Sequence, residues 1–138
     1  MNYIKLIALS PYPIYTEIFI AYAGAFDCKD LYIQLNDNLS NVERYTVLLH
    51  ELTHARHYKR KCICYRKSNC YLRELHAYRF QLRFALRYEM KAILEYTYYH
   101  MTCKYVSNYP IAHQKAIGEI KKQKIWKKLK NYLAIDHL

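Results

Sequence analysis

Short apolar runs separated by turn residues mark the first part of the chain. The runs cover residues 3–9, 14–22 and 31–35, and they are rich in the aromatic and β-branched side chains that favour strands. Residues 15–23 could equally be helical, because a short apolar run does not define a period. The pattern therefore predicts two or three short strands within a β-rich segment, residues 1–38.

A helical period replaces this pattern after the turn signal at residues 36–38. Ser40 and Glu43 have the spacing of a capping box, in which the serine oxygen accepts a backbone N–H and the glutamate reaches back. A helix is therefore predicted over residues 39–60, beginning at Asn41. Its apolar face is formed by Tyr45, Leu48, Leu49, Leu52 and Ala55, and a different face carries His50, His54 and His57.

Two long helices are predicted after a cysteine-containing loop at residues 62–70. Leucine and isoleucine recur at helical intervals over residues 71–107, and no glycine or proline interrupts them. The stop signal before Pro110 starts a last helix, residues 109–134, because proline suits a first helical turn. Glycine and proline, two and three of the 138 residues, are too scarce for a many-turned sandwich or barrel.

These elements predict an α+β fold in a single domain, residues 1–138. A small N-terminal sheet would pack on the helix over residues 39–60, and the two long helices would close the core. A chain of this length buries roughly two thirds of its unfolded surface, which is enough for an independent core. The 17 tyrosines indicate a core that is aromatic and partly polar at its margins.

The charge and the cysteines indicate the environment of the protein. A formal net charge of +11 gives a field that attracts nucleic acid, acidic proteins or anionic lipid. Five cysteines without a secretion signal indicate reduced thiols in a cytoplasm. No run approaches the roughly 18 apolar residues of a membrane span, so a soluble, cytoplasmic protein without a membrane partner is predicted.

The sequence His-Glu-Leu-Thr-His, residues 50–54, carries the most specific chemistry. On a helix, His50 and His54 lie one turn apart on one face, so both imidazoles can bind one zinc ion. Glu51 would stand beside the open position of the metal, as the catalytic base of a hydrolase. The pattern is short, and the alternative is a pair of core or surface histidines with a coincidental glutamate.

A catalytic zinc site commonly has three protein ligands, so a third ligand is needed. Glu74 is the best candidate, because it follows His54 by twenty residues and a short loop could fold its helix back. Glu89 and Glu95 lie farther along the chain, and Glu43 is occupied by the helix cap. The alternative for Glu74 is a solvated carboxylate that the helix dipole stabilises.

Other polar side chains near the motif are candidates for supporting roles. His57 is seven residues from His50, roughly 10 Å along a helix axis, so it is better placed to face substrate or to support a ligand. A donor that stabilises the transition-state oxyanion is also expected. The candidates that the sequence leaves open are His57, His76, Tyr65, Tyr71 and Tyr78.

Residues 31–54, followed by Glu74-Leu-His-Ala-Tyr-Arg-Phe80, resemble the ImmA/IrrE family of zinc metallopeptidases. In that family a strand precedes the active-site helix, an Arg-aromatic-Thr triplet leads into the His-Glu-x-x-His motif, and a downstream Glu-x-x-Ala-x-x-Phe supplies the last ligand. The resemblance implies a zincin-like fold of the gluzincin type, with zinc bound by His50, His54 and Glu74 and with Glu51 as catalytic base.

The same resemblance implies a substrate class. Family members typically cleave a helix-turn-helix repressor encoded nearby, which switches on a mobile element, such as a phage, or a stress response. A DNA-bound repressor is therefore the expected protein substrate. Two departures from the family pattern are Thr53 in place of the usual glycine and Leu82-Arg-Phe-Ala-Leu86 in place of a Leu-Leu-Met-Pro ending, and the second puts substrate choice in doubt more than chemistry.

Cysteines provide a weaker signal for a second, structural zinc site. Cys62, Cys64 and Cys70 could bind a metal ion, with Cys28 or Cys103 as a further ligand. Their spacing is not that of a usual zinc knuckle. Buried or free thiols are the alternative.

Basic residues support a competing class of function. Lys121, Lys122, Lys124, Lys127 and Lys128 surround Trp126 in the last helix, and arginines recur at every fourth position over residues 79–87. Such clusters can bind nucleic acid or an acidic partner, although a solvated helix face is also compatible with them. The alternative to a zinc endopeptidase is thus a non-catalytic basic binding protein, or a phage-type inhibitor, on the same scaffold.

Overall fold

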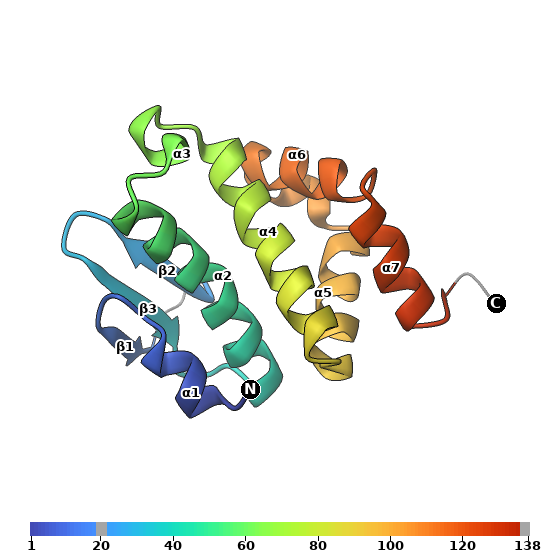
Figure 1. Cartoon of the computed structure of the whole chain (residues 1–138), viewed down its shortest axis with the longest axis horizontal. Coiled ribbons are helices and arrows are strands. Elements are labelled where there is room, and N and C mark those ends of the chain that lie inside the picture. The colour runs from blue at the N-terminus through green and yellow to red at the C-terminus, as the bar shows by residue number, and fades with distance from the viewer. Residues whose placement is uncertain (19–21, 136–138) are drawn as a thin grey trace. The chain divides into compact units, whose positions relative to one another are not determined.

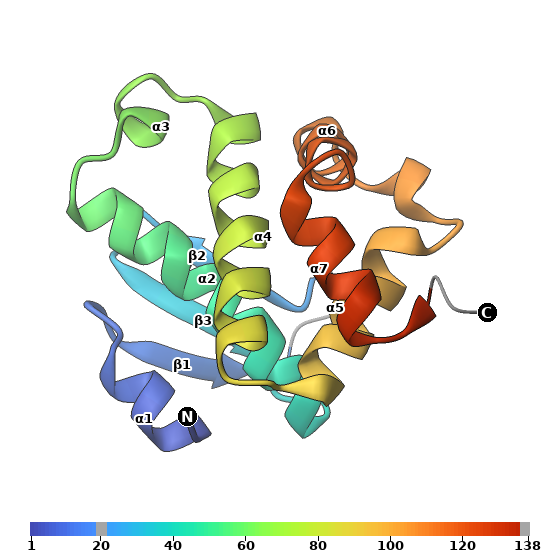
Figure 2. The ribbon, with the colours of Figure 1, turned by 45° about the vertical axis from the view of Figure 1, so that its right-hand side comes forward.

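The computed structural model describes residues 1–18 and 22–135. The chain forms two compact units, an N-terminal unit, Met1–Asn69, and a C-terminal unit, Cys70–Leu138. Figures 1 and 2 show the elements of both units from two directions.

The N-terminal unit combines a three-stranded sheet with a long helix. Within the sheet the strand order is β1-β3-β2, with β1 parallel and β2 antiparallel to β3. Its elements are α1 (Tyr3–Ala8), β1 (Ile14–Glu17), β2 (Gly24–Asp27), β3 (Tyr32–Asn36), α2 (Asn41–Lys59) and α3 (Ile63–Arg66).

The helix α2 packs on the sheet through β2 and β3 (Figure 1). The central strand β3 alternates between buried and half-buried residues, so Ile33 and Leu35 point into the core. Leu48 and Leu49 of α2 are also fully buried. This helix is therefore fixed by apolar contacts on the side that faces the sheet.

Three of the predictions for the N-terminal part need correction. The segment expected to be a loop, residues 62–70, contains the short helix α3. Residues 3–8 form the helix α1 and not a strand, because the side chain of Asn2 caps the helix by accepting the N–H of Lys5 at 2.8 Å. The strand expected over residues 14–22 ends at Glu17, and residues 19–21 of that prediction lie outside the described residues.

The connection between β2 and β3 is held by a side chain at the end of β2. Asp27 accepts the backbone N–H groups of Lys29 and Asp30, each at 2.9 Å. The bond from Asp30, then the bond from Lys29, lowers the pKa of the Asp27 carboxyl. A lowered pKa means that this contribution to stability is present at neutral pH and is lost as the pH falls through the folded-state pKa.

The C-terminal unit is helical. Ala77 of α4 is fully buried, and α4 packs against α5, α6 and α7. The elements are α4 (Cys70–Arg87), α5 (Lys91–Thr102), the single 3₁₀ turn η1 (Val106–Asn108), α6 (Ile111–Ile120) and α7 (Lys124–Tyr132).

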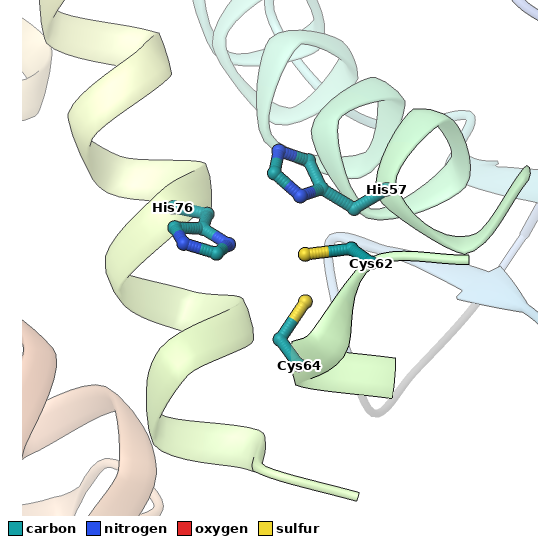
Figure 3. A group of neighbouring side chains, drawn as sticks. All are labelled: His57, Cys62, Cys64 and His76. Atoms are coloured by element: carbon teal, nitrogen blue, oxygen red, sulfur yellow. The ribbon is translucent and has the colours of Figure 1, made fainter. Parts of the chain in front are cut away.

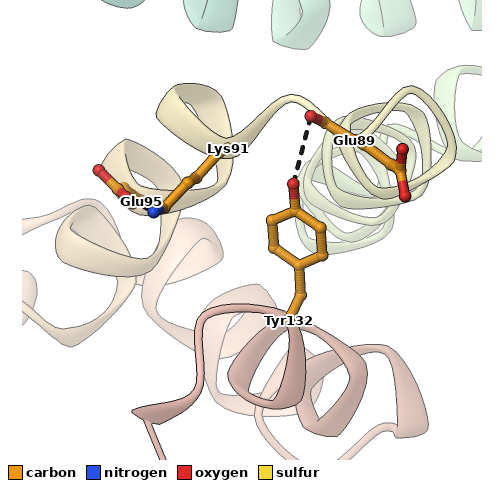
Figure 4. Close-up of polar contacts among 4 residues, drawn as sticks. All are labelled: Glu89, Lys91, Glu95 and Tyr132. Carbon is orange, nitrogen blue, oxygen red and sulfur yellow. Dashed lines mark hydrogen bonds and ion pairs between the residues drawn. The ribbon is translucent and has the colours of Figure 1, made fainter.

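The helix predicted over residues 71–107 is divided into α4 and α5. Glu89 has a left-handed backbone conformation, φ 50°, which ends the helix. The N–H of Met90 donates to the carbonyl of Ala85 at 2.9 Å. The hydroxyl of Tyr132 in α7 donates to the backbone carbonyl of Glu89 at 3.2 Å, and Lys91 forms an exposed ion pair with Glu95 on the other side of the turn (Figure 4).

The helix predicted over residues 109–134 is also divided. Its first part, α6, begins at Ile111, two residues later than predicted, and Pro110 is its N-cap and not part of its first turn. It ends at Ile120, and α7 begins at Lys124. Trp126 and Leu129 are buried on α7, so this short helix is oriented by its apolar side chains. The overall class is nevertheless the predicted one, an α+β chain with a small N-terminal sheet followed by several helices.

None of the helices within the described residues is long and apolar enough to cross a membrane.

The contact between β2 and α2 predicts opposite effects of alanine at the two glycines. A Cβ on Gly24 would lie 2.6 Å from Cγ1 of Val47 and 3.0 Å from the carbonyl oxygen of Gln34. Gly24→Ala should therefore destabilise the protein by about 1–3 kcal/mol. Gly118→Ala, where nothing lies within 4 Å, should stabilise α6 by about 0.5–1 kcal/mol. Urea unfolding of both variants tests this, and equal stability of Gly24→Ala and the wild type would refute the close packing.

Candidate metal centre

The helix that carries the His-Glu-x-x-His motif begins where the sequence predicts. Ser40 is the N-cap of α2, and its hydroxyl oxygen accepts the N–H of Glu43 at 3.2 Å. The first helical residue is Asn41. The cap and the sheet contacts together fix both the start and the rotation of α2.

His50, Glu51 and His54 are nearly buried on this helix, at 9%, 9% and 8% exposure. The ring centroids of His50 and His54 are 5.0 Å apart, and their ligand nitrogens lie within 4.8 Å of each other. Two neutral imidazoles one turn apart are a donor pair that zinc accepts readily. The arrangement within the helix is thus the one that the motif predicts.

Thr53 occupies the position where the resembled family usually has glycine. Its side chain is buried, and its hydroxyl donates to the backbone carbonyl of Leu49 at 2.9 Å. Because this bond gives the buried hydroxyl a partner within the helix, its burial does not carry the free-energy cost of an unsatisfied polar group. Threonine is therefore compatible with a regular helix between the two histidines.

Glu74 and the candidates His76 and Tyr78 lie on α4, in the C-terminal unit. The carboxylate of Glu74 is 3.4 Å from Nδ1 of His113, and the Tyr78 hydroxyl is 2.8 Å from the same nitrogen. These contacts orient the Glu74 carboxylate from within its own unit. The assignment of Glu74 as the third ligand stays a prediction.

His113 was missed by the sequence reasoning. It lies in the first turn of α6, about forty residues from Glu74, and only the packing of α6 on α4 brings the two together. Its position three residues after Pro110 marks a helix start but no chemistry. A side chain of this kind could not be found from spacing along the chain.

Histidine, cysteine and glutamate side chains form groups within the described part of the chain that could bind a metal ion. One such group in the N-terminal unit consists of His57, Cys62 and Cys64, whose ligand atoms lie within 4.8 Å of one another. Figure 3 draws these three side chains together with His76 of α4. The structure therefore associates His57 with thiols, a grouping that the cysteine spacing did not indicate.

The remaining cysteines and tyrosines that the sequence singled out have other surroundings. Cys28 and Cys70 are exposed, and Cys103 is half-buried. Tyr65 packs edge-on against Tyr58, with ring centroids 5.3 Å apart, and Tyr71 is half-buried at the start of α4.

A basic groove of about 730 Å³ lies between α4 and the α6–α7 region of the C-terminal unit. Three of the five lysines singled out from the sequence, Lys122, Lys124 and Lys128, line it. Lys121 instead places its ammonium group 5.9 Å from the centre of the Trp126 ring. The other side chains that line the groove are Arg79, Arg83, Leu86, Arg87, Gln123 and Ile125.

Comparison of the chain with protein-family models, with curated proteins and with solved structures finds no match. The interpretation of the site therefore depends on the residues themselves.

Proposed function

We propose that the protein is a zinc-dependent endopeptidase that hydrolyses a specific protein substrate. The observation that carries the proposal is the pair of nearly buried histidines, His50 and His54, on a capped helix with Glu51 between them. Two imidazoles with their ligand atoms within 4.8 Å suit a tetrahedral metal with nitrogen ligands. The resemblance to the ImmA/IrrE family supports the same chemistry.

In this proposal His50, His54 and Glu74 hold the ion. Zinc, when bound, supplies a Lewis acid for the scissile carbonyl and lowers the pKa of its water towards about 7. The Glu51 carboxylate accepts a proton from the attacking water and passes it to the leaving amine as the C–N bond breaks. Burial of Glu51 keeps bulk water from competing for that proton.

The substrate that the resemblance favours is a helix-turn-helix repressor of a mobile element or of a stress response. A net charge of +11 favours work close to DNA, because positive side chains draw a protein to phosphate. This substrate class is part of the proposal, and so is a cytoplasmic location.

The role of His113 follows from its contacts. Nδ1 of His113 lies 3.4 Å from the Glu74 carboxylate and 2.8 Å from the Tyr78 hydroxyl, so the imidazole can fix the orientation of the carboxylate. Groups that hold a metal-binding carboxylate tune its affinity. In this proposal His113 and Tyr78 act on the metal through Glu74.

A second function is favoured by the basic groove. Six cationic side chains converge there, and three of them, Arg79, Arg83 and Arg87, follow each other at one-turn intervals on α4. Guanidinium groups match phosphate through two parallel hydrogen bonds, so we infer a nucleic-acid backbone as the ligand. This function does not depend on a metal.

Replacement of Glu51 by glutamine should separate metal binding from hydrolysis. Glu51→Gln should retain zinc while it loses about 10²–10⁴-fold in rate, because general-base assistance is removed and the ligands remain. Elemental analysis measures the metal. Mass spectrometry of newly formed N-termini in a proteome-derived peptide library measures hydrolysis.

The matched control is Glu43→Gln, an equivalent change in the first turn of the same helix. It should leave both zinc content and cleavage at the wild-type level. Cleavage by Glu51→Gln at the wild-type rate would show that Glu51 is not the base, and absence of cleavage by the zinc-loaded wild type would contradict the endopeptidase proposal.

Replacement of His113 should weaken zinc binding without touching the histidine ligands. If Glu74 is a ligand, His113→Gln should lower the affinity for zinc about 10–100-fold, since the carboxylate loses its orienting partner. Competition with a chromophoric chelator measures the affinity. His100→Gln, at a histidine that instead contacts the Tyr109 hydroxyl, is the control. Equal zinc affinities of the two variants would show that His113 does not orient a zinc ligand. The argument that Glu74 is a ligand would then fail as well.

Neutralisation of the basic groove should lower the affinity for nucleic acid and make that affinity less dependent on salt. The exposed residues Arg83, Arg87 and Lys128 are changed together to glutamine, and the slope of log K against log salt should fall by roughly 0.7–0.9 per lost phosphate contact. The control variant changes Lys5, Lys29 and Lys104, which are also exposed, and has the same net charge.

Fluorescence anisotropy with a short DNA duplex and with a single strand provides the measurement. Equal slopes for the groove and control variants would show that net charge alone attracts DNA. Displacement of the DNA by polyglutamate at the same charge concentration would indicate an acidic protein as the partner.

A further inference from the structure

Three side chains with metal-binding atoms meet where α2 ends and α3 follows. His57 lies in the last turn of α2, Cys62 precedes α3 and Cys64 belongs to it. Their ligand atoms, one imidazole nitrogen and two sulfurs, lie within 4.8 Å of one another. Figure 3 shows the His57 ring and both sulfur atoms bordering the same space.

The backbone at the end of α2 explains why His57 and Cys62 are neighbours. Lys61 has a left-handed conformation, φ 56°, and its N–H donates to the carbonyl of Tyr58 at 3.0 Å. The N–H of Cys62 donates to the carbonyl of His57 at 2.9 Å. These two bonds define a Schellman motif, in which the side chains at the positions of His57 and Cys62 commonly contact each other.

A second motif of the same kind fixes Cys64. Ser68 has φ 50° and donates its N–H to Tyr65 at 3.2 Å, and the N–H of Asn69 donates to the carbonyl of Cys64 at 2.9 Å. The carbonyl of Cys62 accepts the N–H of Tyr65 at 3.0 Å, which ties the two cysteines to one turn. The positions of all three ligands are thus set by backbone hydrogen bonds.

Aromatic packing makes one side of this turn rigid. Tyr65, next to Cys64, packs against Tyr58, next to His57, with ring centroids 5.3 Å apart, and both contact Phe26 of β2. Cys64 itself is fully buried. A preformed and partly buried group of side chains of this kind lowers the cost of ordering metal ligands.

We propose that His57, Cys62 and Cys64 bind a zinc ion of their own, distinct from the site at His50 and His54. Thiolates and imidazole are the ligands that zinc prefers, and two sulfurs around a tetrahedral zinc are about 3.8 Å apart at a Zn–S distance of about 2.3 Å. Small side-chain rotations would bring ligand atoms that lie within 4.8 Å to that geometry. The ion would join the end of α2 to α3 and so stabilise the helix that carries the catalytic motif.

Cobalt absorption of the full-length chain tests the proposal. Cobalt(II) replaces zinc in such sites, and thiolate-to-cobalt charge transfer gives a near-ultraviolet band that nitrogen and oxygen ligands do not produce. The metal-free, reduced wild type is titrated with cobalt, and the band should saturate at about one equivalent per site and disappear when zinc is added. The band should persist in the double variant His50→Ala/His54→Ala, so failure of the proposed active site would not affect it.

Matched serine variants locate the ligands. Cys62→Ser should lose at least half of the band and Cys28→Ser should keep it, since Cys28 is exposed and outside the group. His57→Gln should keep a sulfur band but bind cobalt at least tenfold more weakly. Circular dichroism confirms that each variant is folded, and Cys62→Ser is preferred to Cys64→Ser because Cys64 is buried.

Three results would overturn the assignment. These are a wild type without a thiolate band, a Cys62→Ser variant with the full band, and loss of the band in Cys28→Ser.

Discussion

The packing of α2 on the sheet is the constraint on which the rest of the N-terminal unit depends. Gly24 in β2 lets that strand approach α2 so closely that a single Cβ would reach Val47. The same packing also determines how the residues of the His-Glu-x-x-His motif are placed. Because α2 packs on β2 and β3, its rotation is fixed, and His50, Glu51 and His54 lie nearly buried along it.

The same helix connects two kinds of metal chemistry. Its middle offers nitrogen ligands beside a carboxylate, which suits a catalytic ion with an open position. Its C-terminal end offers the His57 nitrogen, and the segment that follows adds the sulfurs of Cys62 and Cys64. Backbone hydrogen bonds hold this turn, and such a ligand set suits an ion that stabilises structure. The proposed second ion would therefore hold the helix from the end opposite to the Ser40 cap.

How far the sequence predicts this fold depends on whether local signals are present. The N-cap at Ser40 was confirmed because the hydrogen bond is made within one turn. The start of α6 was predicted only to within two residues, because Pro110 disfavours a helical conformation at Tyr109 and is itself the N-cap. The ends of α2 and α7 lie within two residues of the predicted ones, but the ends of α4 and α6, which divide the two predicted long helices, were not predicted. Within the described residues, four helices are followed by a residue in the left-handed region, where glycine is the usual signal; these residues are Lys61, Ser68, Glu89 and Ala134.

The candidate site divides in the same way between local and distant residues. His50 and His54 are neighbours through the helical period alone, so spacing is sufficient to find them. His57 joins Cys62 and Cys64 only because a Schellman motif reverses the chain, and His113 reaches Glu74 only because α6 packs on α4. Contacts of this second kind depend on backbone geometry and tertiary packing, which residue types at a fixed spacing do not encode.

The charge of the chain gives the two proposed functions separate physical bases. The groove cations lie on α4, on α7 and in the turn before α7, all in the C-terminal unit, while His50, Glu51 and His54 lie on α2 of the N-terminal unit. Phosphate attraction acts over roughly a Debye length and weakens with salt, whereas the proposed proton transfer by Glu51 would require contact and would be insensitive to moderate salt. In a protein that used both, nucleic-acid binding would weaken at a lower ionic strength than substrate hydrolysis. The salt dependence of its biological effect therefore distinguishes a basic binding protein from a peptidase that is only concentrated near nucleic acid.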